Sequence, residues 1–152
     1  MKTKIAVALA ALALTGCMSA EKQAEKDNAF SRAENNLDTA QRNATVQCRD
    51  EAQCNKAWAL TKRYIEQNTS TSVIRADEVA IESDVPTRSG KPVYSATRIR
   101  KGSGATITLD AQCRGMYGPD RSQGGDYDDC AEKIVATQNK FRAFLTTHLS
   151  DN

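Results

Sequence analysis

Histidine and aromatic residues are scarce in this sequence. The chain has one histidine, His148, and aromatic side chains make up only 5% of its residues. Histidine is the most common general base in enzymes, but His148 lies near the C-terminus, at the end of an expected helix where a positive imidazole suits the helix dipole. Gly-x-Ser-x-Gly, His-Glu-x-x-His and phosphate-binding glycine motifs are also missing. We therefore expect no enzymatic activity and no cofactor.

The sequence also lacks a hydrophobic run long enough to span a membrane. The run IAVALAALAL at residues 5–14 has about ten residues, whereas a spanning helix needs about 20. Lys2 and Lys4 precede it, as the positive n-region precedes the h-region of a signal peptide, so we expect residues 1–16 to be removed. Without these two lysines the 21 basic residues fall to 19, equal to the 19 acidic ones. This even balance argues against nucleic acid as a partner.

The four residues that follow the hydrophobic run carry a resemblance to a known class. The segment LTGC at residues 14–17 resembles the lipobox of bacterial lipoproteins. The resemblance implies that Cys17 becomes the first residue and carries a diacylglyceryl thioether and an acylated amine, a stable membrane anchor. Because Met18 stands where an Asp would signal inner-membrane retention, it implies the outer membrane, facing the periplasm. The alternative, a buried or disulfide-bonded Cys17, leaves the leader without an Ala-x-Ala cleavage site.

The other four cysteines form an even set, as expected of an exported chain in an oxidising compartment. Four cysteines allow three pairings, and we expect Cys48 to pair with Cys54 and Cys113 with Cys130. Five residues separate the first two, which matches neither the Cys-x2-4-Cys spacing of zinc sites nor a redox Cys-x-x-Cys motif. We therefore expect structural disulfides and no metal.

Polar residues dominate the segment before the first of these cysteines. We expect residues 17–47 to be the lipidated N-terminus and a tether, ending in a helix over residues 29–44, and residues 48–152 to form one α+β domain. Asp50 and Gln53 resemble a capping box that starts a helix at Glu51, continuing to about Asn68. Trp58 lies on the apolar face of this helix, where a core position is favoured over a ligand platform.

Three extended segments follow, at residues 73–82, 93–101 and 105–113. The last alternates apolar and polar residues with period two, which predicts an antiparallel sheet with one solvent face. Asp129 and Glu132 form a second candidate capping box, from which a final amphipathic helix would begin. The predicted order is helix, three strands, helix: an α+β domain stapled by two disulfides.

Two groups of residues are weak candidates for binding. Arg98, Arg100 and Lys101 cluster at the second hairpin, and Arg98 and Arg100 are expected, together with Tyr94, on the exposed side of the second strand opposite Ile99. Alternatively these charges are simply solvated. The 114–129 loop carries a second group of carboxylates, which are weak calcium candidates or a solvated loop: Asp120, Asp126 and Asp128.

These observations predict a membrane-anchored envelope lipoprotein with a non-catalytic binding or scaffolding role. The expected partners are the membrane, through the lipid anchor, and another envelope protein or cell-wall material. The alternative is a small-ligand or ion-binding module that uses the 114–129 loop. The resemblance to a known class ends at the lipobox, and it identifies no family for the domain.

Overall fold

The computed structural model describes the backbone of residues 2–150 and the side chains of residues 19–150. Cys17 therefore lies outside the residues whose side chains are described. Within the described part of the chain, no helix combines the length and the apolar character needed to cross a membrane. The chain divides into two compact units, Met1–Asn35 and Asn36–Asn152.

The first unit consists of helix. It is the N-terminal part of α1 (Lys2–Asn43), so the helix predicted for residues 29–44 is present and begins much earlier in the chain than expected. Side chains from Ser19 to Ala29 are exposed, and Gln23 donates a hydrogen bond to Asp27 one turn away. The polar segment that we expected to be a tether is thus helical as far as Asn43.

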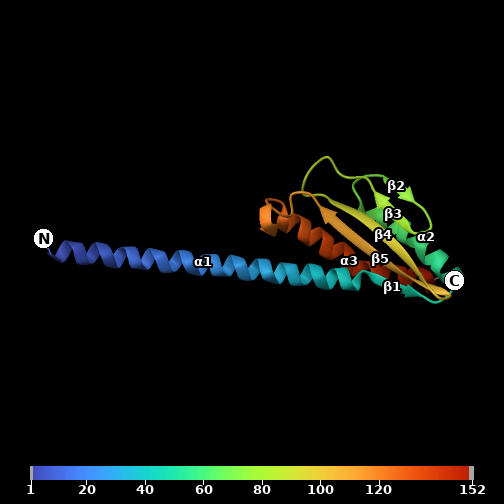
Figure 1. Cartoon of the computed structure of the whole chain (residues 1–152), viewed down its shortest axis with the longest axis horizontal. Helices are drawn as coiled ribbons and strands as arrows, with labels where there is room; N and C mark the ends of the chain where they lie inside the picture. The colour runs from blue at the N-terminus through green and yellow to red at the C-terminus, as the bar shows by residue number, and fades with distance from the viewer. Residues whose placement is uncertain (1, 151–152) are drawn as a thin grey trace. The chain divides into compact units, whose positions relative to one another are not determined.

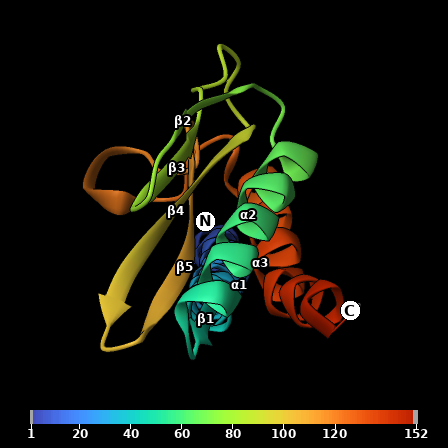
Figure 2. The ribbon, with the colours of Figure 1, turned by 90° about the vertical axis from the view of Figure 1, so that its right-hand side faces the viewer.

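The second unit is an α+β domain built on a five-stranded antiparallel sheet with strand order β1-β5-β4-β3-β2. Figure 2 shows α2 and α3 on the same face of this sheet. A short 3-10 turn, η1 (Pro119–Arg121), precedes α3. The other bounds are β1 Thr45–Cys48, α2 Glu51–Asn68, β2 Val73–Ala76, β3 Ala80–Ser83, β4 Pro92–Lys101, β5 Gly104–Cys113 and α3 Tyr127–Ser150.

The predicted fold class is confirmed, and the sheet has two more strands than the three expected. The segment 73–82 is divided by a turn into β2 and β3. The carboxylate of Asp77 stabilises this turn by accepting hydrogen bonds from the amides of Val79 and Ala80. β1 lies in the segment assigned to the tether, where Val46 pairs with Ile107. The compact unit accordingly begins at Asn36, before the expected boundary at Cys48.

The last turn of α1 and the residue after it belong to the core of this domain. Ala40 and Ala44 are fully buried, and the carbonyl of Ala44 accepts a 2.9 Å hydrogen bond from the amide of Leu109. Gln41 donates to the Leu109 carbonyl and to the Asp110 carboxylate, at 3.2 and 3.0 Å. Burial raises the pKa of Asp110, while the hydrogen bond from Gln41 opposes that rise.

The core lies between the covered face of the sheet and the two helices. Alternate residues of β5 are buried, as the period-two pattern predicts, and they meet the apolar faces of α2 and α3. The largest fully buried apolar side chains are Ile65, Ile81, Ile107, Leu109, Tyr127, Phe141 and Leu145.

Both predicted disulfides are present, and each joins a strand end to a helix start. Cys48 and Cys54 have Cα atoms 5.1 Å apart and connect β1 to the first turn of α2. The cap between them also forms, since the amide of Gln53 donates a 2.9 Å hydrogen bond to Asp50. The Gln53 side chain accepts from the amide of Arg49 at 2.9 Å. The second bond, with Cα atoms 5.9 Å apart, connects the end of β5 to α3.

The predicted start of α3 is wrong. The helix begins at Tyr127, and Asp129 lies inside its first turn, where it pairs with Lys133 at 3.3 Å and caps nothing. The amide of Cys130 donates to the carbonyl of Asp126, which closes the first turn. Because Tyr127 is almost fully buried, its packing fixes the entry of the chain into the helix. A capping box at Asp129 would leave this residue outside the helix.

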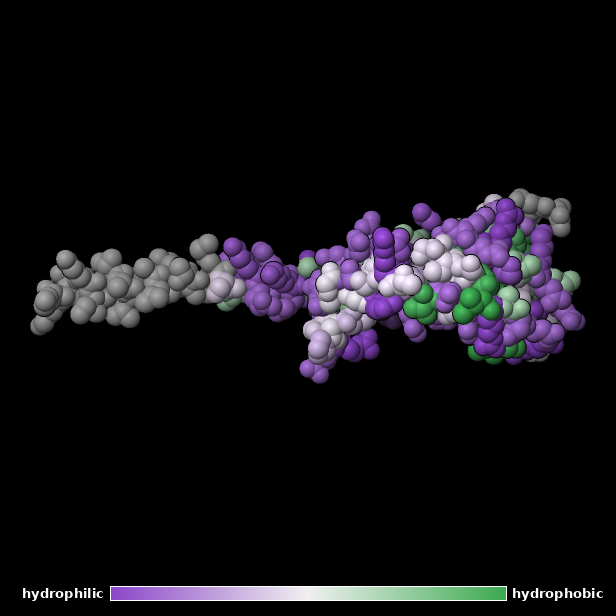
Figure 3. All heavy atoms as spheres, turned by 90° about the horizontal axis from the view of Figure 1, so that it is seen from above, coloured by the Kyte–Doolittle hydropathy of each residue, from purple (hydrophilic) through white to green (hydrophobic). Residues whose placement is uncertain are grey.

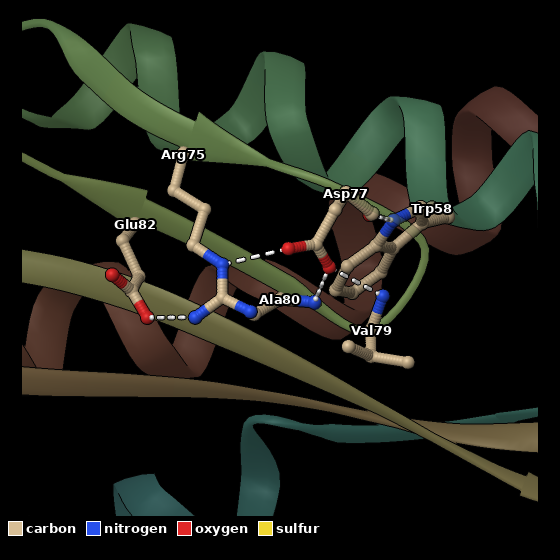
Figure 4. Close-up of polar contacts among 6 residues, drawn as sticks. All are labelled: Trp58, Arg75, Asp77, Val79, Ala80 and Glu82. Carbon is tan, nitrogen blue, oxygen red and sulfur yellow. Dashed lines mark hydrogen bonds and ion pairs between the residues drawn. The ribbon is translucent and has the colours of Figure 1, made fainter.

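Asp77 ties the turn between β2 and β3 to α2 (Figure 4). Its carboxylate accepts hydrogen bonds of 2.9 Å from the amides of Val79 and Ala80 and pairs with Arg75 at 2.7 Å. These bonds lower the pKa of Asp77 to about 2. Its carbonyl accepts a 2.7 Å bond from Nε1 of Trp58. Trp58 is buried and packs in the core cluster, as predicted for this position.

Candidate functional site

Tyr94, Arg98 and Arg100 lie on the face of β4 opposite Ile99, but this is the face that the helices cover (Figure 2). Tyr94 is 2% exposed and Arg98 is 8% exposed, whereas Ile99 is 67% exposed. The predicted exposure is therefore wrong for Tyr94 and Arg98. Arg100 and Lys101, at the end of β4, are exposed. The apolar character of Ile99 was the misleading signal.

Tyr94 lines a cavity of about 310 Å³ between β4 and α3. Its hydroxyl donates to Thr137 Oγ1 at 3.0 Å, and burial raises the pKa of its phenol. Lys133, on the same wall, donates to the carbonyl of Gly90 at 2.9 Å and pairs with Asp129. Tyr94 and Lys133 are thus engaged in holding α3 against the sheet.

Arg98 lines a smaller pocket of about 130 Å³ at the other end of β4. We call it the Arg98 pocket, and its walls come from the start of α2, the end of β4 and the turn into β5. The lining residues are Glu51, Cys54, Arg98, Arg100 and residues 102–104.

The β4–β5 turn that forms one wall is held against the entry of α2. Gly102 has a φ of +62°, which the two-residue turn requires. Ser103 Oγ donates to the carbonyl of Arg49 at 3.1 Å. Gly104 passes so close to the Cys48 carbonyl that a Cβ atom would collide with it. The turn lies at the end of the hairpin formed by β4 and β5 (Figure 1).

The guanidinium of Arg98 has no counterion in the described part of the chain. Its Nε atom is buried without a hydrogen-bond partner, and no ion pair or side-chain hydrogen bond joins Arg98 to another residue within 19–150. Its neighbour Arg100 does have a partner, Glu78, at 3.5 Å. Nε is the one nitrogen of this side chain that is fully buried without a partner, so the terminal nitrogens remain able to donate to an anionic group.

The three acidic residues of the 114–129 loop are not gathered at one point. Asp120 lies in η1 with a φ of 55°, and Asp126 packs against Gly115. Asp128 accepts a 3.3 Å hydrogen bond from Gln123. Among the described residues, no group of three His, Cys, Asp or Glu side chains is placed to hold a metal ion. The loop is organised instead by backbone bonds, such as that from the Gly118 amide to the Ser122 carbonyl.

The surface of the described residues is predominantly polar in the view of Figure 3, with hydrophobic side chains in small patches. The large apolar residues that are exposed come from different elements: Ile74, Val79, Val85, Ile99 and Tyr117. Since an extensive apolar patch is typical of a large protein interface, the Arg98 pocket is the more distinctive binding feature.

Sequence reasoning found Arg98 and Arg100 but missed Glu51 and the role of the turn at residues 102–104. The glycines of this turn indicated a tight connection, and nothing in their spacing indicated that it would close over the start of α2. The juxtaposition arises because the bond between Cys48 and Cys54 holds α2 beside β1, a strand that the sequence did not predict and that pairs with β5.

No family model matches this chain, and no curated protein or solved structure is significantly similar to it. The features of the chain that bear on its function are therefore the leader sequence, the disulfides and the Arg98 pocket.

Proposed function

We propose that this protein is a lipid-anchored lipoprotein of the bacterial envelope whose domain has a non-catalytic binding role. The LTGC segment supports the anchor at Cys17, and Met18 supports the outer membrane facing the periplasm. The two disulfides are consistent with this location, because such bonds form and persist in oxidising compartments outside the cytosol.

The unpaired guanidinium of Arg98 is the observation that carries the binding role. An arginine that is only 8% exposed usually has a partner within the protein, and no described residue pairs with Arg98. A partner that carries a negative group would supply the missing contact. The partner in our proposal is another envelope protein or cell-wall material, and the domain holds it near the membrane.

The position of the single histidine supports a non-catalytic role. A ring nitrogen of His148 lies 2.8 Å from the carbonyl of Phe144, and the two rings stack with centroids 4.3 Å apart. These contacts belong to the last turns of α3. They place His148 at the end of α3, away from the residues that line the Arg98 pocket.

The anchor is tested by intact mass and membrane fractionation of the wild type beside a Cys17→Ser variant. We expect a lipid mass on the N-terminal peptide of the wild type and recovery in the outer-membrane fraction. The variant should lose both. A wild-type chain without lipid, or one that stays soluble after cell lysis, would contradict the proposal.

The binding role is tested by placing a photo-crosslinking residue at position 100 or 99 in cells. These neighbours point to opposite faces of β4, so position 99 is a matched control for position 100. We expect one discrete adduct from position 100, lost on Arg98→Gln substitution, and none from position 99. Equal adducts from the two positions, or no adduct, would argue against a partner at the Arg98 pocket.

A further inference from the structure

The charges around the Arg98 pocket are nearly balanced. Arg98 contributes one unpaired positive charge, and Arg100 is already paired with Glu78. Glu51 also lines the pocket, yet it makes no ion pair with Arg98. With Glu51 counted, these four charges already cancel, so a monoanion adds one negative charge beside Glu51 and a dianion adds two. This balance disfavours a dianion more than a monoanion.

The size of the pocket restricts the ligand to an end group. Its volume of about 130 Å³ is below the roughly 300–1,000 Å³ of pockets that enclose a whole small molecule. The pocket therefore has room for the charged tip of a larger partner or for a very small acid. A guanidinium presents parallel N–H groups that match the two oxygens of a planar carboxylate.

We propose that the Arg98 pocket binds a carboxylate group. The inference rests on the proposed binding role and gives it a chemistry: the carboxylate hydrogen-bonds to the guanidinium of Arg98 at the mouth of the pocket, beside the turn at residues 102–104. The carboxylate is carried by the chain end or an acidic side chain of a partner, or by a free small acid.

Glu51 sets the affinity of this site by repulsion. It is exposed at the first position of α2 and is one of the residues that line the pocket. Glu51→Gln removes a negative charge while keeping the size of the side chain. We expect the variant to bind carboxylate about threefold more tightly, which is the gain from removing a like charge several ångströms away in a water-like dielectric.

The test uses the full chain, isotopically labelled and purified in detergent, and follows the side-chain Nε–H signals of Arg98 and Arg100 by NMR. Sodium acetate is the probe, and sodium chloride at equal ionic strength is the control. We expect a saturable shift at Arg98 with acetate and none with chloride. A shift that is linear in acetate, or equal with chloride, would overturn the proposal, as would tighter binding of inorganic phosphate.

Two variants separate a ligand site from an internal ion pair. If Glu51 forms an ion pair with Arg98 in solution, acetate will bind to the Glu51→Gln variant and not to the wild type, which overturns the proposal for the native protein.

Arg98→Lys keeps the charge and loses the planar donor pair. We expect it to abolish the acetate response at the amides of Gly102 and Gly104, with circular dichroism checking that it folds.

A further pair of probes identifies the source of the carboxylate. Two short peptides of identical sequence, one with a free and one with an amidated C-terminus, are titrated in the same way. Tighter binding of the free form than of acetate assigns the site to a chain end, and binding no tighter than acetate assigns it to a small acid. If acetate fails while the crosslink from position 100 persists, this inference fails and the binding role stands.

Discussion

Nε1 of Trp58 donates a 2.7 Å hydrogen bond to the carbonyl oxygen of Asp77. This single bond connects the middle of α2 to the turn between β2 and β3, and so links a helix to the edge of the sheet (Figure 4). The indole thus combines apolar packing against the core with a polar contact at its rim.

Trp58→Phe keeps most of the apolar contact and removes the donor. We expect it to lower the free energy of unfolding by about 1–2 kcal/mol, because the Asp77 carbonyl is left without this partner. Urea titration followed by circular dichroism measures the change, since Trp58 is the only tryptophan and its fluorescence is lost. Val85→Ala, at an exposed position, is the control and should be close to neutral. If Trp58→Phe leaves the free energy of unfolding unchanged, water replaces the indole N–H as donor to the Asp77 carbonyl at no cost.

Asp77 should make a contribution to the stability of the domain that is lost in acid. Its pKa in the folded state is about 2, below the ordinary value of 3.8. The carboxylate therefore stabilises the fold above pH 4, and this contribution is lost as the pH falls through 2. We expect Asp77→Asn to be less stable than the wild type at pH 6 and to approach it at pH 2. Urea unfolding at both values measures the difference, and a difference that does not change with pH would contradict the assignment.

The two disulfides should differ in their effect on stability. The bond between Cys113 and Cys130 closes a sequence separation of 17, and the bond between Cys48 and Cys54 closes one of 6. Loop-closure entropy then gives about 3 kcal/mol for the first and about 2 kcal/mol for the second. Paired Cys→Ala variants, compared by thermal and urea unfolding, should lose stability in that order. The reverse order would show that packing around the cysteines outweighs chain entropy.

Gly104 is expected to tolerate no side chain. A Cβ atom there would meet the Cys48 carbonyl, whereas one at Gly125 would meet nothing within 4 Å. Gly104→Ala should lower the free energy of unfolding by about 1–3 kcal/mol through overpacking, and Gly125→Ala should have little effect. Thermal melting of the two variants makes the comparison. Equal melting temperatures would show that the β4–β5 turn moves away from α2 without cost.

The features predicted correctly from the sequence are those encoded by neighbouring residues. The cap at Asp50, the pairing of Cys48 with Cys54 and the alternation along β5 each depend on a short stretch of chain. β1 was missed because a strand of four residues in a polar segment has too little pattern of its own. It exists because β5 offers an edge with which it pairs.

The candidate site was predicted only in part, because its geometry depends on which face of β4 the helices cover. Arg98 and Arg100 were identified as candidates, but apolar Ile99 suggested the opposite face for the core. The covered face is determined by Tyr94 and Ala96, which are buried under the helices. Near the end of β4 the polarity of a residue does not indicate which face is buried, because Arg98 is buried there and Ile99 is exposed.

The bond between Cys48 and Cys54 also connects two of the walls of the Arg98 pocket. Cys54 is one of the residues that line the pocket, and Cys48 lies against the turn that forms its other wall. In a reduced chain the entry of α2 loses its covalent attachment to β1, and with it the fixed spacing between Glu51 and Arg98. If the Arg98 pocket binds carboxylates as proposed, we expect that binding to require the oxidised form of the chain.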